Sequence, residues 1–149
     1  MILLQDYWMG RDAKYPDEFT DAIQGQGAEV VRRVNSILVA YEESSGVPLP
    51  LNAVGTHVAS GWRPAAVNDA TSNAASHSKH LSAQACDVYD PNRELARWCV
   101  ENEDVLKEVG VWCEDFRWTP TWAHFQIVPP GSGKRIYIPS TKPPLIGAP

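Results

Sequence analysis

Three residues of this chain could bind a metal ion together. A hydrolytic zinc site requires three protein ligands drawn from His, Asp or Glu, which leaves the fourth coordination position for water. The segment SKHLSAQACD contains His80 and Asp87, and a third candidate ligand, His124, follows in the segment WAHFQ. These residue types predict a site that could hold one zinc ion per chain for hydrolysis.

The spacing of these residues constrains the elements that hold them. His80 and Asp87 are an odd number of residues apart, and on a continuous strand that spacing would place them on opposite faces. We therefore expect His80 in a loop that turns the chain before Asp87 enters a strand. His124 falls in a strand in which Gln126 shares its face. Each residue also has a simpler explanation, because an Asp can cap a turn and a His can make a structural hydrogen bond, and spacing alone leaves both open.

Helical and strand patterns alternate along the rest of the sequence. Apolar residues recur at helical spacing over 27–43, and a second helix over 93–109 follows the opening Asp90-Pro91 and can break near Asn102. Strands are predicted at 53–60, 83–89, 111–116 and 121–128, and a polar surface loop, which can include one helical turn, at 68–79. This order predicts an α+β fold with a small antiparallel β-sheet and flanking helices.

A single domain is expected over residues 1–149, because a chain of 149 residues can bury about two-thirds of its unfolded surface. The motif-bearing core spans about 54–128. Residues 129–149 are predicted to form an extended C-terminal tail on the surface, with one short apolar run at 136–138. The three cysteines are odd in number and none lies in a CxxC pair, which favours buried free thiols over disulfides or a thiolate zinc site.

Composition excludes several classes of partner. The formal net charge is −5, and Lys and Arg never exceed an adjacent pair, so no nucleic-acid footprint is expected. No apolar run approaches the ~18 residues of a membrane span. The apolar start MILL is followed at once by polar and charged residues and does not suit a signal peptide. The chain is therefore expected to remain in a cytoplasm unless it is released.

Three ordered segments resemble a known family. The strings SGWRPAAVN, SKHLSAQACD and WAHFQ resemble the zinc D-alanyl-D-alanine carboxypeptidases and L-alanyl-D-glutamate endopeptidases, which share their fold with the hedgehog signalling domain. That family carries S-G-aromatic-R, then S-x-H-x-x-G-x-A-x-D, then W-x-H. The remainder of the chain is similar to small phage-encoded members. The resemblance covers about half of the chain, roughly 54–128, and implies that His80, Asp87 and His124 bind zinc.

The resemblance also implies roles for residues around the metal. Arg63 would hold the carbonyl or carboxylate of the substrate, a task that suits a planar and permanently charged guanidinium. Asn68 would orient the loop that follows Arg63, and Ser78 would make a hydrogen bond that fixes His80. Trp122, with two other tryptophans, Trp62 and Trp118, would either line a substrate groove or pack in the core.

Two positions depart from the family pattern. The family glycine three residues after the first histidine is Ala83 here, so we expect that turn to avoid a positive φ or to shift by one residue. The family acid three residues before the last histidine is Thr121 here. Glu114 on the preceding strand is then the candidate general base, with Asp115 as the alternative, and in a strand only one of the two can face the metal. A chain without any base is the third possibility.

Together the motifs predict a zinc peptidase that hydrolyses peptide bonds of bacterial peptidoglycan. The resemblance suggests a monomeric phage endolysin, held in the host cytoplasm until lysis and then acting on the cell wall or in the periplasm. The rival interpretations are a non-catalytic zinc-binding or virion structural module of the same fold, for which Thr121 is the main support, and a cytoplasmic D,D-dipeptidase. The motifs do not decide which peptide bond is cut.

Overall fold

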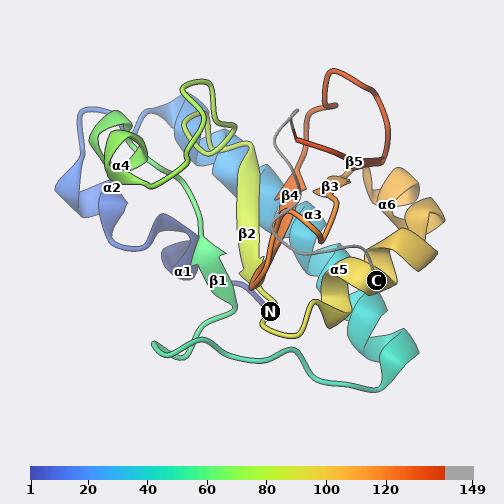
Figure 1. The fold of residues 1–149 in the computed structure, drawn as a ribbon. Helices are drawn as coiled ribbons and strands as arrows, with labels where there is room; N and C mark the ends of the chain where they lie inside the picture. Colours follow the sequence, from blue (N-terminus) through green and yellow to red (C-terminus); the bar gives the residue numbers. More distant parts are fainter. Residues whose placement is uncertain (140–149) are drawn as a thin grey trace.

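The computed structural model describes residues 1–139, which form a mixed α/β structure around one five-stranded sheet (Figure 1). The strand order is β1-β2-β4-β3-β5. All neighbouring strands are antiparallel except β3 and β5, which are parallel. The expectation of a small antiparallel sheet with flanking helices is confirmed except for the parallel β3–β5 pair. The strands are β1 (Val58–Ser60), β2 (Ala85–Tyr89), β3 (Trp112–Glu114), β4 (Trp122–Gln126) and β5 (Ile136–Tyr137).

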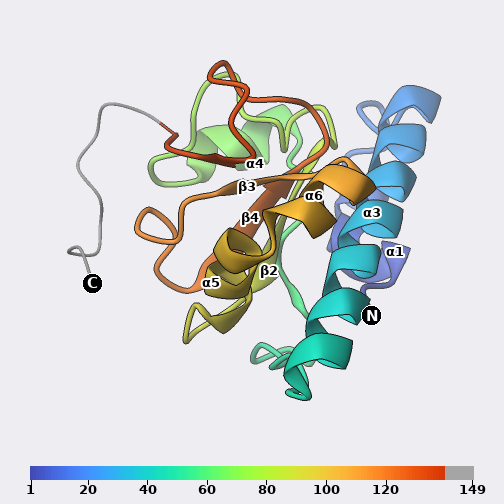
Figure 2. The same cartoon turned by 90° about the vertical axis from the view of Figure 1, so that its right-hand side faces the viewer.

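The helices surround the sheet, and α3 is the longest. Figure 2 shows α3 running along one face of the sheet, with α6 beside it. At the β1 edge lie α1, α2 and α4 (Figure 1). None of the helices in the described residues is both long enough and apolar enough to cross a membrane. The helices are α1 (Leu4–Trp8), α2 (Arg11–Lys14), α3 (Asp21–Ser45), α4 (Ala65–Ala70), α5 (Glu94–Glu101) and α6 (Glu103–Val109).

The apolar face of α3 forms the main core with the back of the sheet. The helix is longer at both ends than predicted, because the Thr20 hydroxyl caps it by accepting a hydrogen bond from the Ile23 amide and because Gly46 ends it in the left-handed region. Its apolar stripe is buried as the helical spacing predicts. The stripe packs against apolar residues of β2, β3 and β4, which alternate along these strands with polar residues on the opposite face of the sheet. These apolar residues are Cys86, Val88, Cys113, Ala123 and Phe125.

The N-terminal helices α1 and α2 were not predicted from the sequence. Tyr7 and Trp8 are both buried, and the Tyr7 hydroxyl donates to the Ala85 carbonyl of β2 at 2.9 Å. A Cβ atom on Gly27 would overlap the Trp8 ring, so a glycine in α3 lets α1 approach closely. These short helices are therefore stabilised by tertiary packing rather than by their own propensity.

Several predicted boundaries shift for local reasons. The expected strand at 53–60 is reduced to β1, because the Asn52 side chain accepts from the Val54 and Thr56 amides and closes a turn there. The expected helical turn at 68–79 lies earlier, as α4. The helix predicted at 93–109 breaks at Asn102 into α5 and α6, as anticipated.

The opening of α5 differs from the prediction. The helix begins at Glu94 rather than directly after Pro91. Asp90 still supplies the cap, since its carboxylate accepts hydrogen bonds from the amides of Leu95 and Ala96. The acidic side chain thus satisfies the helix terminus across a longer loop than the sequence suggested.

The predicted C-terminal tail is not entirely separate from the sheet. Its apolar run contributes β5, whose residues pair in parallel with β3. The rest of the predicted extended tail, 140–149, lies outside the described residues.

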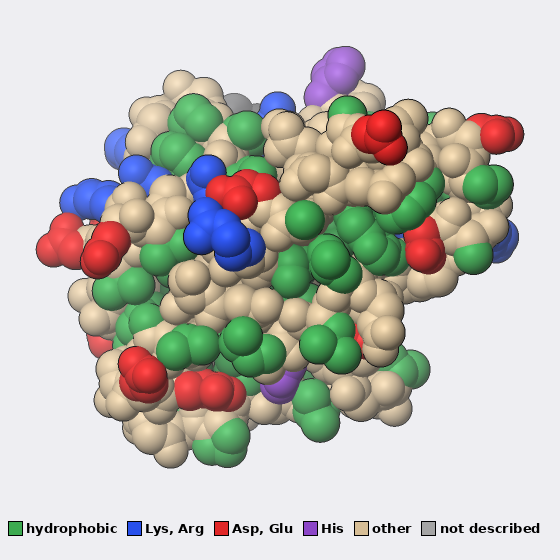
Figure 3. All heavy atoms as spheres, turned by 180° about the vertical axis from the view of Figure 1, so that it is seen from behind, with side chains coloured by type: hydrophobic (Ala, Val, Ile, Leu, Met, Phe, Trp, Pro, Cys, Tyr) green, Lys and Arg blue, Asp and Glu red, His purple; other side chains and the backbone are tan. Residues whose placement is uncertain are grey.

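All three cysteines are free and buried, as expected. On the face seen in Figure 3, Lys and Arg side chains lie interspersed with Asp and Glu rather than in one continuous basic surface.

Candidate metal centre

A row of polar residues crosses the face of the sheet opposite α3. Ser60 pairs with Asp87, and Asp87 pairs with His124. The β3–β4 register, continued by one residue, places Glu114 opposite His124, and Glu114 pairs with Tyr137. Directly paired residues point to the same face of a sheet. All five strands therefore contribute one polar side chain to this row.

His80 reaches this row from the loop before β2, as the spacing predicted. Its carbonyl accepts hydrogen bonds from the amides of Arg63 and Ala83, at 3.0 and 3.3 Å, and its own amide donates to the Ser78 hydroxyl at 3.3 Å. Ala83 adopts a φ of 54° with its methyl group fully buried. The expectation that this turn avoids a positive φ is wrong. The chain accepts the αL conformation, which costs a residue with a Cβ about 1–2 kcal/mol.

The imidazole of His80 is oriented by a backbone carbonyl. Its Nδ1 lies 2.8 Å from the Gly61 oxygen. A carbonyl only accepts, so Nδ1 carries the hydrogen and Nε2 keeps a lone pair. Gly61 can lie here only because it has no side chain. A Cβ would overlap the carbonyl oxygen of Tyr7 and lie 2.7 Å from its carbonyl carbon.

The lone pair on Nε2 has no hydrogen-bond donor. The His80 side chain is 2% exposed, and Nε2 is buried without a hydrogen-bond partner among the described residues. It lies 3.3 Å from Oδ2 of Asp87, which is also an acceptor. Two lone pairs at this separation repel unless a cation lies between them. An orphaned buried nitrogen aimed at a carboxylate is the arrangement that a metal ion would satisfy.

His124 completes the cluster from β4. Its Nδ1 lies 2.7 Å from Oδ1 of Asp87. One ligand atom from each of His80, Asp87 and His124 lies within 4.8 Å of the others. The structure thus brings the three predicted ligands to metal-binding distance, and two imidazoles with one carboxylate are a donor set that suits zinc.

Charges within the cluster shift the pKa values in opposite directions. Burial lowers the pKa of His80, and the neighbouring Asp87 charge only partly offsets it, so the neutral imidazole is favoured. Burial alone would raise the pKa of Asp87, but the two neighbouring imidazoles of His80 and His124 hold it well below its usual range. Burial would lower the pKa of His124, but the hydrogen bond with Asp87 raises it instead. Asp87 is therefore an anion ready to bind a cation.

Arg63 lies at the edge of the cluster. Its Nε donates to the Ser60 hydroxyl at 3.0 Å, and one terminal nitrogen donates to Oδ2 of Asp87 at 3.2 Å. The side chain is 11% exposed. The other terminal nitrogen makes no hydrogen bond within the described part of the chain, and an anionic or carbonyl oxygen of a ligand could bind there.

Of the two candidate bases, Glu114 and not Asp115 lies on the metal face. Burial raises the pKa of Glu114, the charge of His124 lowers it, and the charges of Asp87 and Asp115 raise it further. Asp115 instead accepts two hydrogen bonds from the Arg117 guanidinium, at 2.9 and 2.7 Å, and Arg117 lowers its pKa. A carboxyl group with a raised pKa opposite His124 on the metal face is a candidate for proton transfer at this site.

The remaining predicted site residues are less central. Asn68 is buried on α4 and donates to the Ala75 carbonyl, so it holds the loop before His80. Ser78 binds the backbone of His80 rather than its ring. Trp122 is half-buried opposite Tyr89 on the sheet. Trp62 is 1% exposed and packs against other aromatic rings, so it belongs to the core and does not line a groove.

Sequence reasoning did not assign a role to Gly61, Gln126 or Tyr137. Gly61 lay inside a matched motif, and a glutamine two residues after a candidate ligand histidine was a usable signal for Gln126. Tyr137 could not be found, because it lay in the predicted tail. Its hydroxyl donates to Gln126 at 2.9 Å, and its ring lies 6.5 Å from that of His124.

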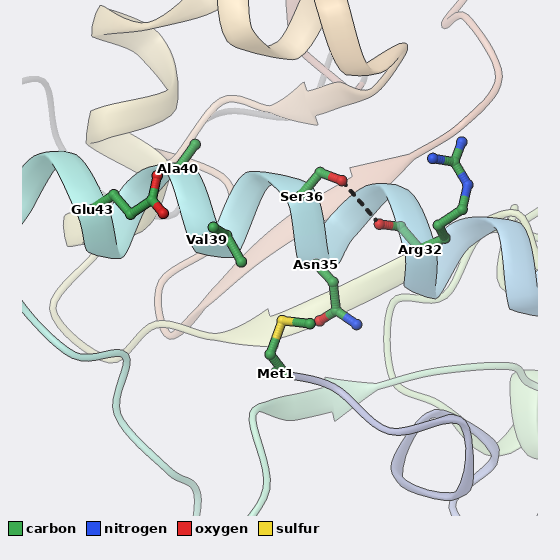
Figure 4. A pocket seen from close by; sticks show the side chains of 7 residues that line it. All are labelled: Met1, Arg32, Asn35, Ser36, Val39, Ala40 and Glu43. Carbon is green, nitrogen blue, oxygen red and sulfur yellow. Dashed lines mark hydrogen bonds between the residues drawn. The ribbon is translucent and has the colours of Figure 1, made fainter.

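A surface hollow lies away from this cluster. It has a volume of about 480 Å³ and lies between Met1 and α3, as Figure 4 shows. Because α3 covers the other face of the sheet, this hollow does not open onto the metal centre. Its lining mixes apolar side chains, such as Val39, with polar ones, including Arg32, Asn35 and Glu43.

Comparisons with known proteins add no relative to these observations. No protein-family model matches the chain, and neither a curated protein nor a solved structure matches it. The site is therefore interpreted from its own geometry and from the motifs that the sequence carries.

Proposed function

We propose that this chain is a zinc peptidase of hedgehog-like fold that hydrolyses peptide bonds of bacterial peptidoglycan, of the D-Ala-D-Ala carboxypeptidase or L-Ala-D-Glu endopeptidase type. The observation that carries the proposal is the convergence of two imidazoles on the buried Asp87, with the Nε2 lone pair of His80 left without a donor. The order of the three motifs supports the choice of substrate.

A zinc ion, when bound by His80, Asp87 and His124, supplies a Lewis acid that polarises the scissile carbonyl and lowers the pKa of water at the site toward ~7. Such chemistry needs an open coordination position, and within residues 1–139 three protein ligands converge at this point. A site closed by four protein ligands would instead suit a structural role.

The residues around the metal would divide the remaining work. Glu114 would accept a proton from the attacking water and return it to the leaving amine, and its position on the metal face supports this role. Arg63 would hold the substrate carbonyl or carboxylate and stabilise the negative charge that develops on the oxygen. Asp87 orients this guanidinium through the bond at 3.2 Å.

A phage endolysin is the biological role that we favour, because the sequence resembles small phage-encoded members of that family. The alternative is a non-catalytic zinc module of the same fold, which the exposed Thr121 at the usual position of the acid would support. A D,D-dipeptidase is a third form of the same chemistry. All three bind zinc, so metal content does not separate them.

Turnover on purified peptidoglycan separates these candidates. Zinc-loaded protein is expected to release new amino termini from cell walls, and the chelator-treated protein is expected to release none until zinc is restored. Release that requires zinc and is lost in Glu114→Gln supports the peptidase. Activity on free D-Ala-D-Ala but not on cell walls would favour the dipeptidase. Zinc-loaded protein that is inactive on both would overturn the catalytic proposal.

A further inference from the structure

The amide of Gln126 is fixed in one orientation by its neighbours. Gln126 is 5% exposed on β4. Its Nε2 donates to the Val128 carbonyl at 2.7 Å, and its Oε1 accepts from the Tyr137 hydroxyl at 2.9 Å. A flipped amide would place an acceptor against the Val128 carbonyl and would lose the first of these bonds. Oε1 is therefore held on the side of the sheet that carries Tyr137.

His124 lies on the same face and can use this oxygen. Gln126 follows His124 by two residues on one strand, so both side chains project toward the metal centre. The Nδ1 atom of His124 faces Asp87, which leaves Nε2 as the nitrogen available to Gln126. The Tyr137 ring, whose hydroxyl fixes Oε1, lies 6.5 Å from the His124 ring, so the oxygen is held beside this imidazole. Tyr137 occupies only one of the two lone pairs of Oε1, so a second is free for an imidazole N–H.

We propose that Gln126, locked by Tyr137, is a positioning residue that keeps the hydrogen of His124 on Nε2 and so directs the Nδ1 lone pair of His124 to the metal. This inference rests on the metal centre of the proposed function but not on catalysis. Without a metal ion, Nδ1 also carries a hydrogen, which it donates to Asp87 at 2.7 Å. A bound cation would displace this hydrogen rather than the one on Nε2, because a lone pair on Nε2 would repel the Oε1 acceptor.

The two histidines are then held by two different oxygens. The Gly61 carbonyl keeps the hydrogen of His80 on Nδ1, which directs Nε2 to the metal. The Gln126 side chain keeps the hydrogen of His124 on Nε2, which directs Nδ1 there. The two imidazoles therefore offer opposite ring nitrogens to one ion. Only the second of these supports is a side chain, so only that one can be removed without altering the backbone.

The zinc-loaded protein itself tests the tautomer. We would label the four histidines with nitrogen-15, load the protein with one equivalent of zinc and record long-range proton–nitrogen correlations of the imidazoles. Single-site His→Ala variants would assign the signals. His124 is expected to carry its hydrogen on Nε2 and to bind zinc through Nδ1, with the reverse pattern for His80. A His124 that binds through Nε2 would overturn the proposal without the need for any Gln126 variant.

Substitutions test whether Gln126 is responsible. Gln126→Leu removes the acceptor and is expected to lower zinc affinity about 10- to 100-fold, the usual effect of losing a group that orients a ligand. Gln126→Glu keeps an acceptor oxygen and should restore affinity to within a few-fold of the wild type. Tyr137→Phe, which only unlocks the amide, should lose less than Gln126→Leu. Gln24→Leu, at a glutamine in the first turn of α3, serves as the control and should not change zinc affinity.

The outcomes distinguish this inference from the proposed function. Folding of each variant is checked by circular dichroism, and affinity is read by competition with a chelating dye. A Gln126→Leu protein that is folded, binds zinc as tightly as the wild type and keeps the His124 signals unchanged would overturn the inference while leaving the peptidase proposal intact. A wild-type protein that binds no zinc would overturn both. A wild-type protein that binds zinc but does not hydrolyse cell walls would overturn only the peptidase proposal.

Discussion

Gly61→Ala is expected to damage both the fold and the metal centre, although it adds only one methyl group. The new Cβ would overlap the carbonyl oxygen of Tyr7 and lie 2.7 Å from its carbonyl carbon and 2.9 Å from its Cδ2 atom. Two of these atoms belong to the backbone of α1 and cannot rotate away. Either α1 or the segment at Gly61 must move, and the latter carries the carbonyl that orients His80.

The size of the effect follows from both displacements. Overpacking against rigid neighbours costs about 1–3 kcal/mol or more, and we expect about 3 kcal/mol here because the obstacle is backbone. For a chain of this size that corresponds to a fall in Tm of about 6–12 °C. Movement of the carbonyl away from Nδ1 of His80 should also lower zinc affinity about 10- to 100-fold.

Calorimetry of the metal-free protein and a zinc competition titration would measure the two effects. Gly25→Ala is the matched control, since no atom would lie within 4 Å of the added methyl group and the site is inside α3. It should raise stability by about 0.5–1 kcal/mol and leave zinc affinity unchanged. A Gly61→Ala protein that melts and binds zinc like the wild type would refute the close packing of α1 against this glycine and its role in holding His80.

Further substitutions have different expected signatures. Arg63→Lys keeps the charge but loses the planar fork, so zinc content and Tm should be nearly unchanged while wall hydrolysis falls at least about tenfold. Glu114→Gln should retain zinc but lose at least about 100-fold in turnover, whereas Asp115→Asn should be mild, and the reverse order would exchange their roles. Two arginines of α3 hold the pKa of Glu29 at about 2, below its ordinary value of 4.5. Its contribution is therefore present above pH 4.5 and is lost as the pH falls through 2. These side chains are partly exposed, so in denaturant titrations Glu29→Gln should cost at most about 1 kcal/mol of stability at about pH 7 and nothing below about pH 2. An equal cost at both pH values would contradict the interaction of Glu29 with the two arginines.

Local patterns predicted the central part of the fold well. Strand patterns marked β2 and β4, and the structure pairs Asp87 with His124 on one face of the sheet, as a shared metal site requires. The odd spacing between His80 and Asp87 correctly required a loop, because a strand has a period of two. The helical stripe of α3 was equally clear. These features depend on residues close in sequence, which is why the sequence alone could reveal them.

Features that depend on distant contacts were missed or misjudged. Tyr7 and Trp8 show no long periodicity, and α1 is stable because it packs on α3 and β2. Ala83 takes a positive φ that glycine would normally occupy, because its surroundings impose that turn. Tyr137 looked like part of a tail, but β5 pairs with β3 and so brings it to the sheet. In each case tertiary packing outweighs the local preference.

The zinc content of the purified chain tests the three-residue centre most directly. Wild-type protein dialysed against excess zinc and then against buffer should retain about one zinc ion per chain, and His80→Ala should retain none, because the buried Nε2 supplies one of the three ligands found among the described residues. Retention should also weaken below about pH 6, where protons compete for the imidazoles. Equal zinc in the wild type and in His80→Ala, or none in either, would contradict the centre formed by His80, Asp87 and His124.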